Sequence, residues 1–187
     1  MRRAAISLLA VIAAACAGQQ AEPVGAPRQT SVAITSDDGS TSYGVRITHE
    51  DYIARADLDV PVDRVFAALS EAYQRVGLPS PELDAASYLG KVDGVRVMRR
   101  LGDVPMSRYL ECGSGITGAY ADTHRVTLFV NTALEPVGAD KTIVRTRVEA
   151  TGAPTGGGGG TRPCTSMGAL EQQIAEWLLK LSVIGGA

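Results

Sequence analysis

The sequence predicts an α+β domain: an antiparallel β-sheet of about 5–7 strands with two helices packed on one face. Two segments with the apolar spacing of helices, about 62–76 and 166–182, stand near the two ends of a series of alternating, strand-like segments. Helices at the ends of a meander cannot be the crossovers of a parallel sheet, so we expect antiparallel pairing between them.

The N-terminal segment has the pattern of a secretory signal. Arg2 and Arg3 precede an apolar run over 4–15, which ends in small residues directly before Cys16. As a helix this run would reach only about 18 Å, against about 30 Å for the hydrocarbon core of a bilayer. It is too short to span a membrane, so we expect residues 1–15 to be a cleaved signal peptide.

The segment from Ile12 to Cys16 resembles the lipobox of bacterial lipoproteins, although Ala13 stands where Leu is usual. The resemblance implies that acyl chains such as palmitate on Cys16 hold the protein at a membrane of the bacterial cell envelope. Ala17, where an Asp would mark inner-membrane retention, implies the outer membrane with the domain in the periplasm. The alternative is an ordinary signal peptide that is cleaved nearby.

The residues after the signal divide into a tether and a single domain. Residues 16–30 are rich in Ala, Gly, Pro and Gln without apolar periodicity, which predicts a lipid anchor and a flexible tether. Residues 31–187 are expected to form one domain. Removing Arg2 and Arg3 changes the formal charge from −2 to −4, so the chain has no basic footprint for nucleic acid.

The first half of the domain predicts three strands and a helix. Residues 31–35 and 43–48 flank Asp38-Gly39 and indicate a hairpin, and 53–60 alternates as a strand with one buried face. The period then becomes helical over 62–76, between Pro61 and Gly77. The apolar residues of this helix are Val62, Val65, Phe66, Leu69, Tyr73 and Val76.

The second half predicts further strands, a glycine-rich loop and the last helix. The expected strands and turns are 83–91 and 95–101 around Asp93-Gly94, then 106–112, and 124–134 and 141–151 around 136–138. In the last strand Arg145 and Arg147 are expected on a solvated face. A flexible loop over 153–163 leads to the helix, with Thr165 or Ser166 as N-cap. Its predicted apolar stripe is Met167, Leu170, Ile174, Trp177, Leu178 and Leu181, with Trp177 in the core.

With Cys16 assigned to lipid, Cys112 and Cys164 remain as a pair. In an oxidising compartment the simplest expectation is one disulfide, which would close a loop of about 50 residues and contribute roughly 4 kcal/mol. The alternatives are a metal site, for which neither histidine has zinc-partner spacing, and a nucleophilic Cys112, which needs a base and a reducing environment.

The order of elements, and the passage LDVPVDRVFAALSEAY in particular, resembles helix-grip proteins. These include the START/polyketide-cyclase-like superfamily and the domains of the Bam-complex lipoprotein C. The first group implies an apolar ligand cavity between sheet and helix, and the second implies a role beside outer-membrane protein assembly. The resemblance covers roughly residues 43–182, and it implies no catalytic or binding residue.

The string CGSGITG contains a G-x-G-x-x-G at Gly113, Gly115 and Gly118. A dinucleotide fingerprint needs a strand before the glycines and a helix after them, so that the helix N-terminus faces the pyrophosphate. Here 119–123 leads into another strand, so we expect a flexible turn between two antiparallel strands, held by Cys112.

No motif predicts catalysis. The chain has no paired-histidine metal spacing, no P-loop and no glycosidase-like carboxylate cluster. His49-Glu50-Asp51 is expected to be a polar bulge or turn, and His124, beside Asp122, to open a strand. We expect a non-catalytic envelope protein without cofactor or metal, acting through contacts with an envelope partner or structural support. The alternatives are a binder of a lipid or other apolar ligand between the sheet and the C-terminal helix, and an exported enzyme.

Overall fold

The computed structural model describes residues 29–35, 42–50, 53–156 and 159–184. The predicted signal peptide, Cys16 and most of the tether lie outside these residues. The elements in chain order are β1 (Gln29–Thr35), β2 (Ser42–Glu50), β3 (Ile53–Leu58), α1 (Val62–Arg75), β4 (Glu82–Asp84), β5 (Leu89–Met98), β6 (Arg100–Leu101), β7 (Val104–Pro105), η1 (Met106–Arg108), β8 (Leu110–Glu111), β9 (Ser114–Gly115), β10 (Gly118–Ala119), α2 (Tyr120–Thr123), β11 (Arg125–Val137), β12 (Lys141–Ala153), β13 (Arg162–Ser166) and α3 (Ala169–Ile184).

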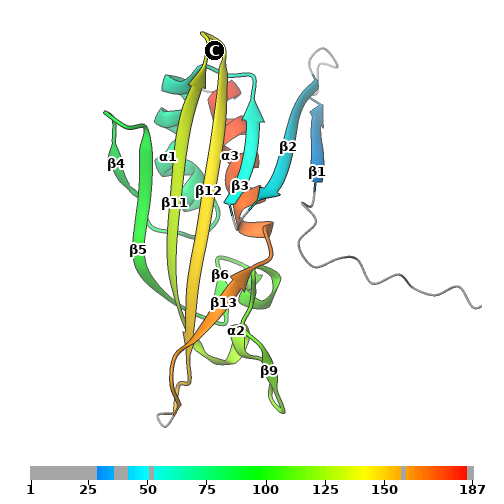
Figure 1. The fold of residues 1–187 in the computed structure, drawn as a ribbon, viewed down its shortest axis with the longest axis vertical. Coiled ribbons are helices and arrows are strands. Elements are labelled where there is room, and N and C mark those ends of the chain that lie inside the picture. Colours follow the sequence, from blue (N-terminus) through cyan, green and yellow to red (C-terminus); the bar gives the residue numbers. More distant parts are fainter. Residues whose placement is uncertain (1–28, 36–41, 51–52, 157–158, 185–187) are drawn as a thin grey trace, which may run out of the picture.

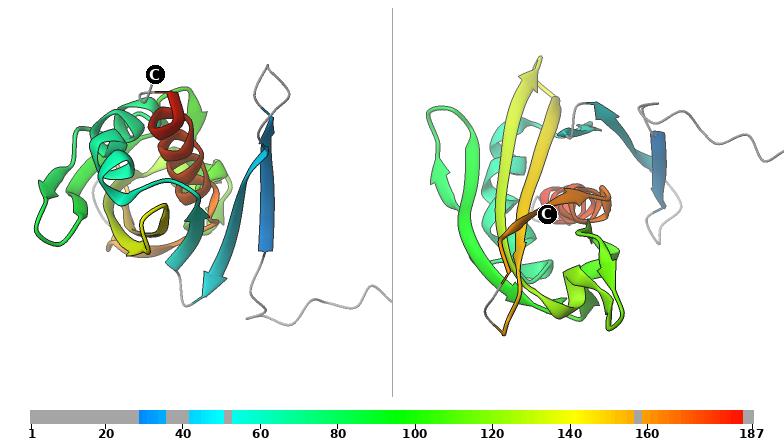
Figure 2. Two further views of the ribbon diagram at one scale, coloured as in Figure 1. Left: turned by 90° about the horizontal axis from the view of Figure 1, so that it is seen from above. Right: turned by 60° about the horizontal axis from the view of Figure 1, so that its bottom comes forward.

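These elements form the predicted α+β domain (Figure 1). The main sheet has the strand order β1-β2-β3-β12-β11-β5-β6-β7, with β4 beside β5 and β13 beside β12 and β8, and its pairings are antiparallel. The long strands β11 and β12 form its centre. Helices α1 and α3 pack against each other on one face of this sheet (Figure 2).

The predicted first helix is confirmed almost to the residue. It begins directly after Pro61, where the missing N–H is harmless, and ends at Arg75. Gly77 has a left-handed φ of +87°, which turns the chain out of the helix. The N–H of Leu78 then donates to the carbonyl of Tyr73 at 2.9 Å and closes the last turn.

Alternation along the central strands places one set of side chains in the core, as predicted. Between the buried residues of β12 lie Arg145, Arg147 and Glu149, which point to solvent because successive side chains of a strand alternate between faces. The buried residues are Ala54, Ala56 and Leu58 on β3, and Thr142, Val144, Thr146, Val148, Ala150 and Gly152 on β12.

Three buried hydroxyls cross the core in a chain of hydrogen bonds. The Tyr73 hydroxyl lies 2.8 Å from Thr132 Oγ1, which lies 3.1 Å from Thr146 Oγ1. Burial raises the pKa of Tyr73 to about 12, so the phenol stays neutral. The pairing satisfies polar groups that would otherwise be left alone in an apolar interior, and it joins α1 to the two central strands.

The hairpin predicted at Asp93-Gly94 is wrong. Both residues lie inside β5, where they form a bulge opposite Phe129 of β11. Gly94 has a φ of +67°, and a bulge needs such a residue just as a tight turn does, so the dipeptide did not distinguish them. The reversal lies at 85–88, where the Asp84 carboxylate accepts from the turn backbone.

Two elements in the second half of the chain differ from the prediction. The expected strand over 106–112 begins with the short helix η1, and only Leu110–Glu111 forms a strand. The last helix begins at Ala169, because 162–166 pairs with β12 and β8 as β13 instead of entering the helix. Met167 therefore lies outside the helix and is exposed, although the predicted stripe included it.

Smaller differences concern the hairpins. Residues 29–30, assigned by the sequence to the tether, lie in β1 because they pair with β2. The β1–β2 pairing is as predicted, and its Asp38-Gly39 turn lies outside the described residues. Between β11 and β12 the reversal lies at 138–140, since Pro136 and Val137 still pair with β12.

Candidate functional site

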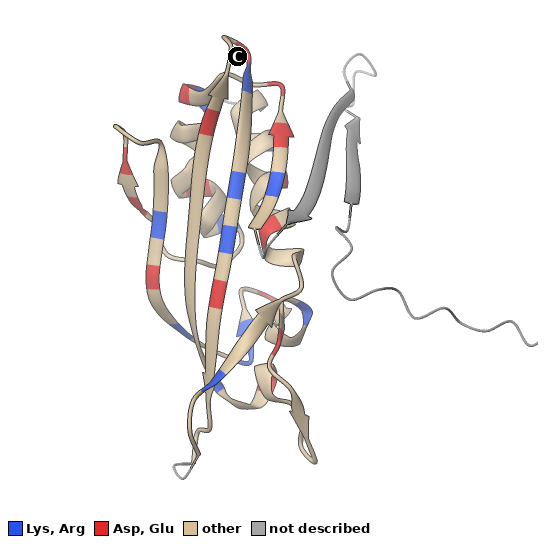
Figure 3. Cartoon of the chain, in the orientation of Figure 1, with Lys and Arg blue, Asp and Glu red and all other residues tan. Residues whose placement is uncertain are grey.

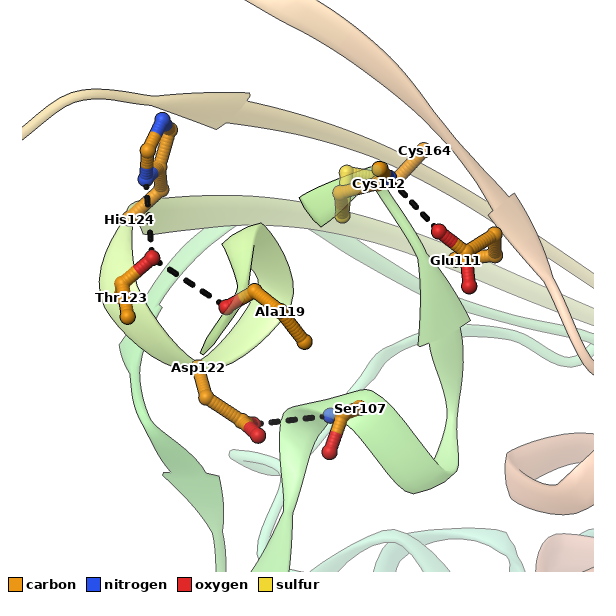
Figure 4. The surroundings of a disulfide bond; sticks show 9 residues. Ser107, Glu111, Cys112, Ala119, Asp122, Thr123, His124 and Cys164 are labelled. Carbon is orange, nitrogen blue, oxygen red and sulfur yellow. Dashed lines mark hydrogen bonds between the residues drawn. A yellow bond between two sulfur atoms is a disulfide. The ribbon is translucent and has the colours of Figure 1, made fainter. Parts of the chain in front are cut away.

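Cys112 and Cys164 form a disulfide, as predicted (Figure 4). Their Cα atoms are 4.2 Å apart, and the residues are separated by 52 positions in the sequence. Cys112 follows β8 and Cys164 lies in β13, so the bond reinforces the pairing of these two short strands. A cysteine in a disulfide has no free thiol, so the metal site and the nucleophile that the sequence left open for Cys112 do not exist in this state.

The glycines of CGSGITG form a small hairpin instead of a phosphate loop. Gly115 in β9 pairs with Gly118 in β10, and the chain then enters the single-turn helix α2. The sequence did not predict this four-residue helix. A side chain at Gly115 would place its Cβ 2.8 Å from the Tyr120 hydroxyl, and the Arg162 guanidinium lies 4.4 Å from the Tyr120 ring. The glycines therefore allow the hairpin to pack on an aromatic ring.

The polar residues considered as acids or bases are held in structural contacts. Asp122 accepts the backbone N–H of Ser107 at 2.9 Å and does not face His124, whose Nδ1 lies 3.3 Å from Thr123 Oγ1 (Figure 4). His49 and Glu50 lie within β2 and not in the predicted turn, because they pair with β3, while Asp51 is outside the described residues. Within the described ranges no three His, Cys, Asp or Glu residues cluster as metal ligands would.

The arginines of β12 lie on the solvated face of the sheet, as predicted (Figure 3). Arg145 pairs with Glu135 of β11 at 3.1 Å, and Arg147 pairs with Glu149 on its own strand. About half of each of these side chains remains exposed. Surface ion pairs of this kind contribute at most about 1 kcal/mol each, so these arginines add little to stability.

Where the described strands β3 and β12 meet α3, the region in which an apolar ligand was the alternative expectation, the side chains are closely packed. Ala54, Ala56 and Val144 from the strands meet Ala175 and Glu171 from the helix, and the gap between them leaves about 0 Å³ for a water-sized molecule. Cavities that hold small ligands occupy about 300–1,000 Å³. The packing here therefore does not favour a ligand between these elements.

Glu171 is an unexpected feature of this interface. Its side chain is 2 % exposed, its Oε1 accepts the Ser166 hydroxyl at 2.6 Å, and its Oε2 has no partner among the described residues. Burial raises the pKa of Glu171, while the hydrogen bond from Ser166 lowers it by less. The carboxyl group is thus easier to protonate in the folded protein than in the unfolded chain.

We expect the free energy of unfolding of the wild type to fall as the pH rises, because the buried Glu171 carboxyl group becomes charged. Glu171→Gln should abolish this fall. A raised folded pKa means that the stabilisation is complete below the ordinary value of 4.5 and is lost as the pH passes through the folded pKa. Urea unfolding of both proteins from about pH 4, near the ordinary pKa of a carboxyl group, up to about pH 8 checks this. Parallel stability curves for the two proteins would contradict it.

Helices α1 and α3 leave an open groove of about 580 Å³ on their outer surface. The Arg75 guanidinium lies 5.3 Å, and Lys180 Nζ 5.0 Å, from the centre of the Trp177 ring. Trp177 packs against the core but is half-buried at the groove and not enclosed in the core as predicted, because one part of its ring lines the groove. The residues that line the groove are Arg64, Ala67, Ala68, Glu71, Arg75, Trp177, Lys180, Leu181 and Ser182.

Sequence reasoning missed this groove. The spacing of Trp177 and Lys180, three residues apart on one helix, indicates that they share a face. Arg75 comes from the other helix, more than 100 positions earlier in the chain, so nothing local to the sequence signals its contact with the indole. Only the packing of α1 on α3 brings the three side chains together.

Comparison with protein-family models, curated proteins and solved structures finds no match. The helix-grip and lipobox resemblances therefore stay predictions. Of the helices in the described part of the chain, none has both the length and the apolar character needed to cross a membrane. Three described features bear on function: the disulfide, the close packing of β3 and β12 on α3, and the groove between α1 and α3.

Proposed function

We propose that this chain is a lipoprotein of the bacterial envelope that acts through contacts with another protein and not by catalysis. The anchor is the acylated Cys16 at the outer membrane, with the domain in the periplasm. The lipobox-like sequence supports the anchor, and the disulfide supports export, since structural disulfides persist in oxidising compartments.

The observation that carries the proposal is the contrast between the close packing of β3 and β12 on α3 and the open groove between the helices. Among the described residues, the gap between β3, β12 and α3 leaves about 0 Å³, whereas the outer surface of the helices offers a concave site of about 580 Å³ with a half-buried tryptophan. Tryptophan and arginine are enriched at the energetic centres of protein interfaces. A surface of this composition favours a protein partner over a carried lipid.

The anchor is tested by metabolic labelling with a palmitate analogue. The wild type is expected to take up the label, and Cys16→Ser to take up none, because the acyl chains are attached to that residue. Cys112→Ser, which is far from the signal, is the control and should be labelled like the wild type. Labelling of Cys16→Ser would overturn the lipoprotein proposal.

The protein-contact role is tested by crosslinking in intact cell envelopes followed by purification of the chain. A specific partner is expected to be captured by the wild type in repeated experiments. Capture of no specific protein would contradict the proposed function, and so would an enzymatic activity that a single polar substitution abolishes.

A further inference from the structure

We propose that the groove between α1 and α3 binds an acidic segment of the partner protein, with an apolar side chain of that segment packed on Trp177. This inference rests on the proposed function and adds the chemistry of the partner. Three features of the groove support this partner: its charge, the apolar residues that line it, and the cations beside the indole.

The groove is basic although the chain as a whole is acidic. Its walls carry three cationic side chains, Arg64, Arg75 and Lys180, and one anionic side chain, Glu71. Glu71 is already paired with Arg75 at 2.7 Å. Arg64 and Lys180 form no ion pair with any residue in the described ranges. In a chain of formal net charge −2, such a local excess of positive charge favours an anionic partner.

The apolar part of the groove combines two small side chains with two large ones. It is formed by Ala67, Ala68, Leu181 and the Trp177 ring. Alanine side chains let a second backbone approach α1 closely, and the indole offers a broad apolar surface. This combination suits an amphipathic segment, which lays its apolar side chains into a groove between helices while its charged side chains meet the rim.

Two cations share the Trp177 ring, Arg75 at 5.3 Å and Lys180 at 5.0 Å. Each is attracted to the ring. Arg75 is already paired with Glu71, whereas Lys180 has no ion-pair partner in the described ranges and attracts a carboxylate of the partner to the position beside the indole. An acidic residue next to an apolar residue in the partner would therefore occupy the site better than an apolar residue alone.

A membrane surface with anionic lipids is the competing occupant, and the shape of the site disfavours it. Residues that insert into a bilayer project outward, whereas Trp177 is half-buried at a concave surface between the helices. A flat headgroup layer would contact the rim of the groove and leave its apolar part empty. A protein segment can enter it.

The test uses the full chain and the fluorescence of Trp177, which is the only tryptophan. The probe is a short helical peptide without aromatic residues, rich in Glu and Asp, with Leu on one face; its control has Lys in place of the acidic residues. We expect a saturable change in Trp177 emission with the acidic peptide, weakened by salt, and none with the Lys peptide. No saturable change with the acidic peptide would overturn the inference.

Charge reversal distinguishes binding at the groove from nonspecific attraction between the peptide and the net charge of the protein. Arg64→Glu with Lys180→Glu is expected to weaken binding of the acidic peptide, measured by calorimetry, by roughly tenfold or more. The matched control is Arg96→Glu with Arg125→Glu, the same change in net charge on exposed residues of the opposite sheet face. An equal loss in both double variants would overturn the inference. If the glutamate variant does not fold, Arg64→Gln with Lys180→Gln replaces it and should weaken binding by a smaller factor.

Two further measurements keep the inference distinct from the proposed function. Vesicles of phosphatidylglycerol and phosphatidylethanolamine are titrated in the same way; tighter binding to them than to the acidic peptide would replace the proposed partner by a membrane. Crosslinking in envelopes is repeated with the groove variant. Loss of the captured partner supports the inference. Capture that is unchanged would overturn the inference and leave the protein-contact function standing.

Discussion

Removal of the Cys112–Cys164 disulfide is expected to lower the free energy of unfolding by about 4 kcal/mol. The bond closes a loop across 52 positions, and without it the unfolded chain gains the conformational freedom of that loop. For a domain of this size the loss corresponds to a fall in Tm of roughly 10 °C. Unfolding in urea of the wild type and of Cys112→Ser with Cys164→Ser, both made in a Cys16→Ser chain, measures it.

Reduction provides the control for this experiment. A reducing agent should shift the unfolding midpoint of the disulfide-containing protein to that of the double serine variant, and it should leave the double variant unchanged. Thiol titration of the unfolded, unreduced Cys16→Ser chain should find no free thiol. A midpoint that does not respond to the reducing agent would contradict the stabilising role.

Gly77→Ala is expected to destabilise the fold by roughly 3 kcal/mol or more. A Cβ at this position would lie 2.5 Å from the backbone nitrogen of Gly102 and 2.9 Å from its Cα, and the φ of +87° is itself unfavourable for a residue with a side chain. The neighbour is backbone and cannot rotate away. The end of α1 would therefore have to separate from the segment after β6.

Gly138→Ala is the matched control for this substitution. Gly138 also has a positive φ, +68°, but a Cβ there meets nothing within 4 Å. Only the unfavourable φ contributes here, so the free energy of unfolding should fall by about 1 kcal/mol. The difference between the two variants in urea unfolding measures the steric contact alone. Equal losses would show that Gly77 and Gly102 do not approach each other as described.

Several differences between prediction and structure have one cause, the ambiguity of local turn signals. Asp93-Gly94 carries the residues of a tight hairpin, yet it forms a bulge because β11 continues past it on the other side. The segment Arg162–Ser166 was assigned to the end of a loop and the cap of a helix, yet it pairs with β12 and β8. In each case a distant strand decided which of two locally acceptable conformations formed.

The candidate functional site also has one part that the sequence predicts and one part that it does not. The disulfide could be predicted because the count of cysteines and the signal-like N-terminus leave few alternatives. The groove could not, because its three cations come from two helices whose contact no local pattern specifies. Trp177 has an apolar neighbourhood in the sequence, and only the packing of α1 beside α3 leaves it half-buried at the groove.

By itself the sequence determined the α+β class, the first helix and the inner faces of β3 and β12, because the periods of 3.6 and 2 are set by the local geometry of the backbone. It also determined the pairing of two cysteines. The tertiary structure alone decided the bulge in β5, the strand β13, the burial of Glu171 and the groove around Trp177. Each of these depends on contacts between residues far apart in the chain, whose free energies exceed the weak local preferences of the residues concerned.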